Sequence, residues 1–147
     1  MGSEMCIRDS LEDLQEQWSK DCIFDELDLG SESLKVPSLH QKYHVYYNKY
    51  KLVIEDEKCK LKTLRKSKWM YYNGKGPDIN GEYFDHKILK GDINTFLESD
   101  KDIQRQQLKI TYFETCINYI EAILKMINSR GFQVKNAIDA KRFEFPV

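Results

Sequence analysis

Long apolar runs are absent from this sequence, and so are the features of a secreted or membrane protein. No run approaches eighteen apolar residues, which a membrane-spanning helix needs. No apolar stretch follows a basic start, so we expect no secretory signal and a cytoplasmic protein. Seven glycines and three prolines among 147 residues are few for the turns of an all-β domain. The sequence therefore predicts one helical domain of ordinary size.

The residue spacings of metal sites and of common catalytic sites are also missing. The four cysteines are far apart, so the zinc-ligand pattern is absent, and we expect reduced thiols with Cys116 buried. His40 and His44 are four residues apart, but a third metal ligand is missing. The segment from Gly74 to Gly76 lacks the spacing of a phosphate loop. We expect no metal, no cofactor and no enzymatic activity.

The first ten residues look foreign to the rest of the chain. Met5 to Ser10 resembles a translated transposon end used as a sequencing-library adapter. We therefore interpret residues 1–10 as a non-native adapter or cloning scar, and expect the native chain to start near Leu11. A native disordered arm is the alternative.

An acidic segment over residues 11–33 comes next, with eight acids and one base, a net charge of −7. Leu14 and Trp18 have helical spacing, so we expect a short amphipathic helix capped by Ser10. Residues 30–33, Gly-Ser-Glu-Ser, are typical of a loop. The acidic helix should therefore end before a second helix begins.

A long central helix is predicted within residues 34–75, from about residue 38 to 72. Pro37 suits its first turn and Gly74 its end. Its apolar side chains recur at three- and four-residue steps, close to a heptad seam, which Glu57 and Lys68 interrupt. At 1.5 Å per residue the helix is about 50 Å long, so it should pack against another long helix, within the chain or from a neighbouring subunit. The apolar stripe consists of Leu39, Tyr43, Tyr46, Tyr50, Val53, Leu61, Leu64 and Tyr71.

Residues 76–99 are expected to be mainly loop, because glycine, proline and asparagine are frequent there. A hairpin between residues 83–84 and 88–89 and a short helix over 92–97 are the regular elements that we expect in this region. The segment separates the long helix from the C-terminal helices.

The C-terminal region, residues 100–147, is predicted to be helical. Asp100 can cap a helix that we expect to end at Arg130, before a C-cap glycine at Gly131. A last short helix over 133–143 should follow. The predicted fold is all-α, with an elongated protomer, one long central helix and a C-terminal helical region that forms an oligomer.

A basic block at the end of the long helix is the strongest local feature. Residues 58–75 contain seven bases and no acid, so the formal net charge of −1 conceals a segregated charge. On a helical wheel the cations and two aromatic side chains gather beside the apolar stripe, with Lys68 at its edge. Such a face suits single-stranded DNA, because cations neutralise phosphates and aromatic rings stack on bases. A merely solvated cationic face is the alternative. The candidate residues are Lys58, Lys62, Arg65, Lys66, Lys68, Trp69, Tyr72 and Lys75.

Several short motifs along residues 11–147 occur in a characteristic order. They are Leu11-Glu12-Asp13-Leu14-Gln15-Glu16, the basic pair Lys66 and Lys68, Tyr71-Tyr72-Asn73-Gly74-Lys75-Gly76, Ser99-Asp100-Lys101-Asp102, Ser129-Arg130-Gly131-Phe132, Lys135 and Arg142-Phe143-Glu144. In this order and spacing the chain resembles the UvsY recombination mediators of T-even-like bacteriophages. The resemblance covers essentially all of residues 11–147 as a single domain.

This resemblance implies a non-enzymatic mediator of DNA recombination, repair and replication in the infected bacterial host. Such a protein binds single-stranded DNA and helps a RecA-like recombinase displace a single-strand DNA-binding protein. The resemblance also implies a closed homo-oligomeric ring, and its DNA-binding motif carries over to Lys66 and Lys68; the other candidates come from the helical wheel. A helical, coiled-coil-like adaptor that does not bind DNA is the alternative function.

Overall fold

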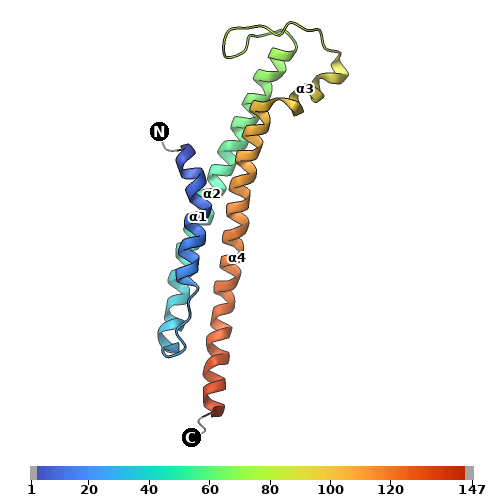
Figure 1. The fold of residues 1–147 in the computed structure, drawn as a ribbon. Coiled ribbons are helices and arrows are strands. Elements are labelled where there is room, and N and C mark those ends of the chain that lie inside the picture. Colours follow the sequence, from blue (N-terminus) through green and yellow to red (C-terminus); the bar gives the residue numbers. More distant parts are fainter. Residues whose placement is uncertain (1–2, 145–147) are drawn as a thin grey trace. The chain divides into compact units, whose positions relative to one another are not determined.

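A computed structural model describes the backbone of residues 3–144 and the side chains of residues 11–144 (Figure 1). This part of the chain contains helices and no strand, which confirms the predicted all-α class. Within it, no helix is both long and apolar enough to span a membrane. The elements are α1 (Ser3–Asp21), α2 (Leu29–Tyr72), the 3₁₀ helix η1 (Lys90–Asp92), α3 (Ile93–Ser99) and α4 (Lys101–Glu144).

Helix α1 begins earlier than the sequence suggested. Ser10 lies inside the helix, so the prediction that it caps the N-terminus is wrong. No glycine or proline stands between Ser3 and Ser10 to interrupt the helix. The side chains of residues 1–10, which we interpret as an adapter scar, lie outside the described residues, so this interpretation stays a prediction. From Leu11 on, the amphipathic pattern is confirmed, because Leu14 is buried and Trp18 is half-buried.

Two compact units divide the chain. The first contains residues 1–51 and 114–147, and the second contains residues 52–113. Helices α2 and α4 each contribute one part to each unit. Every member of the predicted apolar stripe on α2 is buried or half-buried, which confirms the face that the heptad-like spacing selected.

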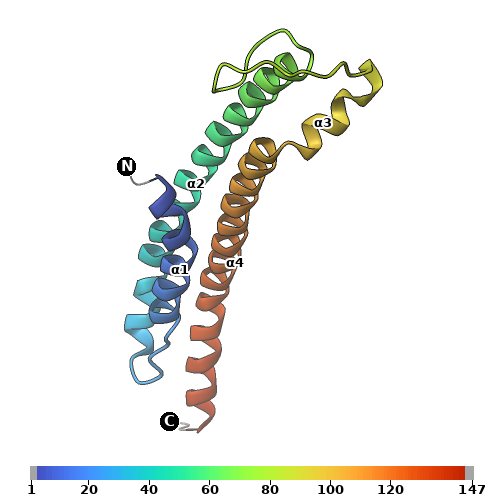
Figure 2. The ribbon, with the colours of Figure 1, turned by 45° about the horizontal axis from the view of Figure 1, so that its top comes forward.

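The core of the first unit lies between α1, the first half of α2 and the second half of α4; Figures 1 and 2 both show α1 beside α2. Trp18 packs edge-to-face on Tyr43, with ring centroids 5.6 Å apart. The Tyr43 hydroxyl donates to Asp21 Oδ2 at 2.8 Å, and Lys42 pairs with the same oxygen at 2.6 Å. Helix α4 contributes buried side chains at steps of three and four residues, as a helix–helix seam requires. The buried apolar residues are Leu14, Leu29, Tyr43, Tyr50, Cys116, Ile120, Ile123, Ile127 and Val134.

Helix α2 begins well before its predicted start, so the expectation of a loop over residues 30–33 is wrong. Asp28 caps the helix: its Oδ1 accepts the backbone N–H of Ser31 at 3.1 Å. The backbone N–H of Glu32 reaches the Asp28 carbonyl at 3.1 Å. Pro37 consequently lies inside the helix rather than in its first turn. The cap and the burial of Glu32 together carry the helix through this polar stretch.

Arg130 on α4 is the centre of a buried polar contact in the first unit. It is only 4% exposed and pairs with the buried Glu32 at 2.6 Å. Its guanidinium also donates to the backbone carbonyls of Asp21 and Ile23, at 2.8 Å each. The ring of Phe24 lies 5.7 Å from the guanidinium carbon. One side chain therefore joins α4 to the end of α1, to the following loop and to the first turn of α2.

Helix α4 continues through Gly131. The predicted end at Arg130 and the separate helix over 133–143 are therefore wrong. Gly131 does not have a positive φ, and a helical glycine costs only about 1 kcal/mol relative to alanine. Arg130 and Val134, on either side of it, are both buried and continue the seam. Tertiary packing thus outweighs the local preference of glycine to end a helix.

The segment between α2 and α3, in the second unit, is an irregular loop in both views (Figures 1 and 2). The predicted hairpin between residues 83–84 and 88–89 is wrong, because the described part of the chain contains no strand. A tight turn forms instead, in which Asp78 Oδ1 accepts the backbone N–H of Glu82 at 2.9 Å and Gly81 adopts a φ of 80°. The predicted short helix that follows is present as η1 and α3.

We expect Arg130→Met to lower the free energy of unfolding by about 3–5 kcal/mol at neutral pH, because it leaves the Glu32 carboxylate buried without its counter-charge. Urea unfolding at a fixed protomer concentration, followed by circular dichroism, measures this loss. Lys20→Met is the matched control, since the Lys20–Glu16 ion pair is largely exposed and should contribute little.

The Arg130–Glu32 pair also makes the stability of the protein depend on pH. Burial raises the pKa of Glu32, but hydrogen bonds from Lys35 and Arg130 outweigh burial and hold the pKa below 4.5. A carboxyl group with a lowered folded pKa stabilises the fold above its unfolded pKa and loses this contribution as pH falls through the folded pKa. The stability difference between the parent protein and Arg130→Met should therefore shrink below about pH 4. A difference that is unchanged at about pH 3 would contradict this account.

Candidate nucleic-acid interface

All eight candidate residues lie in the second unit, on α2 or just beyond its end. Gly74 ends the helix as predicted, with a φ of 70°. The Lys75 N–H donates to the Met70 carbonyl at 2.8 Å and the Gly74 N–H to the Tyr71 carbonyl at 3.0 Å. These two bonds form a Schellman motif, which terminates a helix at a glycine. The motif places Lys75 immediately after the last turn of α2.

Glu57, the first interruption of the apolar stripe, is buried against the beginning of α4. Its Oε2 accepts a hydrogen bond from Gln106 Nε2 at 2.6 Å, and its Oε1 lies 3.5 Å from Lys109 Nζ and 3.2 Å from Lys60 Nζ. Burial raises the pKa of Glu57, but these contacts outweigh burial and lower it. Because a buried carboxylate needs such partners, Glu57 fixes the register of α2 and α4 within this unit.

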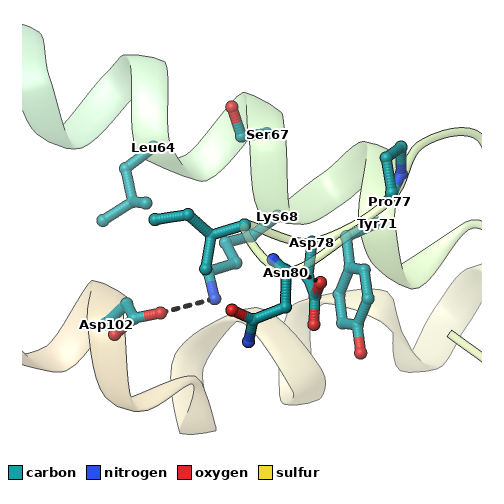
Figure 3. A pocket seen from close by; sticks show the side chains of 9 residues that line it. Leu64, Ser67, Lys68, Tyr71, Pro77, Asp78, Asn80 and Asp102 are labelled. Carbon is teal, nitrogen blue, oxygen red and sulfur yellow. Dashed lines mark hydrogen bonds and ion pairs between the residues drawn. The ribbon is translucent and has the colours of Figure 1, made fainter. Parts of the chain in front are cut away.

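Lys68, the second interruption, contacts the N-terminus of α4 (Figure 3). Its Nζ lies 2.7 Å from Asp102 Oδ2 and 3.2 Å from Asp100 Oδ2. Burial lowers the pKa of the Lys68 ammonium, but the two carboxylates outweigh burial and raise it above its usual 10.5. The Lys68 side chain is only 20% exposed. Its charge is therefore compensated within the fold instead of being presented to solvent.

Asp100 caps α4, as its place before the predicted helix suggested. Its Oδ1 accepts the backbone N–H groups of Asp102 at 2.9 Å and Ile103 at 3.1 Å. Its Oδ2 accepts the Tyr72 hydroxyl at 2.6 Å. Burial raises the pKa of Asp100, but the bonds from Tyr72, Ile103 and Lys68 outweigh burial and hold the pKa below 3.8. This carboxylate thus connects the helix cap, the tyrosine and the lysine.

Tyr72 belongs to an aromatic cluster rather than to the exposed face of α2. Its ring centroid lies 5.1 Å from Phe84 and 5.7 Å from Phe96, and Tyr71 lies 5.5 Å from Phe84. The two contacts with Phe84 are edge-to-face and the contact with Phe96 is tilted. Edge-to-face pairs at such distances are favourable beyond the area that they bury. Because its ring and its hydroxyl are both engaged, Tyr72 holds the loop and α3 against the end of α2.

Exposed cations remain on one side of α2. Lys62, Arg65 and Lys66 are exposed and form no ion pair with any residue in the described part of the chain. Lys58, one turn earlier, is exposed and lies 3.7 Å from Glu55. Side chains three and four residues apart are neighbours on a helix, so these four form one continuous strip. We call Lys58, Lys62, Arg65 and Lys66 the basic row.

Trp69 lies one turn beyond the basic row and is 41% exposed. The Lys75 ammonium lies 4.6 Å from the centroid of its ring, a cation–π contact. An indole ring and a further cation therefore continue the row towards the end of the helix. Of the eight candidates, the structure brings six together along this side and engages Lys68 and Tyr72 in internal contacts.

A cavity of about 510 Å³ lies between the end of α2, the following loop and the start of α4 (Figure 3). The carboxylates of Asp78 and Asp102 line it together with the compensated Lys68. Two carboxylates beside one lysine make this cavity unsuitable for a phosphate group. Its lining residues are Leu64, Ser67, Lys68, Tyr71, Pro77, Asp78, Ile79, Asn80 and Asp102.

Sequence reasoning did not pair Lys68 with Asp100 and Asp102. A signal was present, because a charged residue at the edge of an apolar stripe needs a counter-charge when another helix covers that stripe. Asp100 and Asp102 do lie at the N-terminus of α4, as cap and first-turn residue, and they also supply this counter-charge. Within the described residues no three His, Cys, Asp or Glu side chains are grouped to hold a metal ion.

A helical protein with a strip of exposed cations along one long helix has the kind of surface that suits a nucleic-acid backbone. The chain belongs to the UvsY family: the family model described as "Recombination, repair and ssDNA binding protein UvsY" matches residues 17–145. This finding agrees with the resemblance given by the sequence motifs, and it identifies a bacteriophage family.

Relatives support the same assignment. The recombination protein uvsY of Enterobacteria phage T4 is 31% identical over 137 residues, which cover 91% of this chain and 96% of that protein. Crystal structures of the bacteriophage T4 recombination mediator protein UvsY match with 28% identity. Two lattice types, IV and I, give a TM-score of 0.82 and cover 90% of this chain and 98% of the other. Lattice type II gives a TM-score of 0.81 and covers 96% of the other chain.

We expect Lys68→Met to lower the free energy of unfolding by about 1–3 kcal/mol, because it leaves the buried Asp100 without its cation. Lys66→Met, two residues away and exposed, is the matched control and should unfold like the parent protein. Urea unfolding of the full chain compares the two variants. Equal stability of Lys68→Met and Lys66→Met would show that the contact with the aspartates contributes nothing.

Proposed function

We propose that this chain is a non-enzymatic recombination mediator that binds single-stranded DNA through the basic row, Trp69 and Lys75. The observation that carries the proposal is the strip of exposed cations in a member of the UvsY family, in which Lys62, Arg65 and Lys66 form no ion pair with any described residue. In this role the protein helps a RecA-like recombinase to form a filament on DNA covered by a single-strand DNA-binding protein. In this proposal, residues 11–147 act as one functional domain.

From the contacts of the described residues we infer different parts for the candidate side chains. Lys62, Arg65 and Lys66 are exposed, so they can neutralise phosphates and release counterions. The exposed Trp69 ring offers a surface on which a base can stack. Lys68 and Tyr72 support the site by joining the end of α2 to Asp100 at the start of α4. In this proposal they position the basic row and do not bind DNA.

Removing two cations of the basic row should weaken DNA binding and reduce its salt dependence. For the double variant Lys62→Ala and Lys66→Ala, the slope of log K against log salt should fall in magnitude by about 1.4, since each contact to a single strand contributes about 0.7. Fluorescence anisotropy with a labelled single-stranded oligonucleotide, titrated at several salt concentrations, measures both effects. Lys49→Ala is the control, because this exposed lysine lies elsewhere on α2.

An unchanged salt slope in the double variant would reject the basic row as the DNA site. A parent protein that forms an oligomer but shows no salt-sensitive DNA binding would instead favour the alternative, a helical adaptor. The first outcome would reject only the location of the DNA-binding site, whereas the second would reject DNA binding as the function.

Ring assembly is the second part of the proposal. Phe132 and Phe143 lie eleven residues apart, and therefore on the same side of α4, and they are 73% and 88% exposed. Large apolar side chains exposed on one side of a helix offer a surface for association. A ring would place several basic rows on one particle, so weak contacts would add up by multivalency. Light scattering should therefore give a mass several times 17.5 kDa at micromolar concentration. A monomer under these conditions would contradict the ring.

A further inference from the structure

A second hollow in the second unit lies between α2, α3 and α4, and it differs from the cavity of Figure 3. It is a groove of about 470 Å³ with an apolar floor. Leu61 is half-buried, Ile103 is buried, and Leu108 is 68% exposed at the open side. An exposed leucine beside a buried isoleucine offers a ligand apolar surface that the fold itself leaves uncovered.

Polar groups surround this floor. The Gln104 amide donates through Nε2 to the Glu98 carbonyl at 3.0 Å, which leaves its Oε1 as an acceptor. The Gln107 side chain forms no hydrogen bond with any residue that the structure describes, so its amide donors and acceptor are available. Arg65, which belongs to the basic row, forms one wall. Glu98 also belongs to the lining, so apolar, amide, acidic and guanidinium side chains converge on one small volume.

The groove is continuous with the basic row. Arg65 lines it, and Lys62 and Lys66 lie three residues before and one residue after Arg65 on the same helix. A strand whose phosphates contact Lys62 and Lys66 therefore passes the opening of the groove. The cavity of Figure 3 has no such neighbour, since its only lining cation, Lys68, is paired with acids.

We infer that this groove holds a nucleobase of the single strand whose phosphates bind the basic row, an inference that rests on the proposed function. A base has an apolar π-face, which fits the floor formed by Leu61, Ile103 and Leu108 and stacks on a guanidinium plane such as that of Arg65. The edge of a base carries hydrogen-bond donors and acceptors. The Gln107 side-chain amide can pair with either, because it has both an NH₂ donor and an oxygen acceptor. The cations at the rim favour this anionic ligand over an apolar segment of a second copy.

The experiment compares two single-stranded oligonucleotides of equal length and charge, one with bases and one with abasic sites throughout. The parent protein should bind the strand with bases more tightly. The double variant Gln107→Ala and Leu108→Ala should lose about tenfold in affinity for that strand, the scale of one stacked base, and bind the abasic strand as before. Leu52→Ala is the matched control, because this leucine is 73% exposed on α2 and does not line the groove.

The outcomes separate the groove from the basic row. An equal loss for both strands, or no loss for either, would overturn the inference, and so would a fall in oligomer mass with an unchanged preference for bases. That last result would make the groove a contact between copies of the chain. Lys66→Ala should weaken the binding of both strands alike. If only this variant loses affinity, the proposed function is supported and the inference about the groove is rejected. Circular dichroism of each variant verifies that the helices are intact.

Discussion

A charged side chain that is covered by protein needs a counter-charge, and this constraint organises both units of the chain. In the first unit, Arg130 satisfies it for Glu32 and also collects two backbone carbonyls. In the second, Glu57 finds Gln106 and Lys109, and Lys68 finds the aspartates at the start of α4. An apolar seam alone tolerates slippage by one heptad, whereas these pairs are satisfied in one register only.

The same constraint sorts the basic residues of α2 into two groups. Lys68 lies on the covered side and its charge is consumed by Asp100 and Asp102. Lys62, Arg65 and Lys66 lie on the uncovered side, where they form no ion pair with any described residue. A cation without an internal partner keeps its full attraction for phosphate. The basic row therefore consists of cations that helix packing does not cover. The net charge of the chain says nothing about this division.

The sequence predicts features that depend on neighbouring residues and misses those that depend on distant ones. The heptad-like stripe, the Gly74 cap and the Asp100 cap were predicted correctly, because each depends on neighbours within one or two turns. The start of α2 and the passage of α4 through Gly131 were not, because partners about a hundred residues apart decide them, as Arg130 and Glu32 do. For the same reason the wheel placed Lys68 at the edge of the stripe but could not show that Asp102 meets it there.

Selectivity for a single strand follows if the basic row and the groove act together. Both involve Arg65, so a ligand must bring phosphates and a base to the same turn of α2. A duplex cannot do this without cost, since its bases are stacked and paired inside the backbone, and taking one out of the stack requires a few kcal/mol. A single strand has its bases already exposed and a flexible backbone, so it meets both requirements at once. Discrimination would then arise from the spacing of two ordinary surfaces on one helix, without any contact that reads sequence.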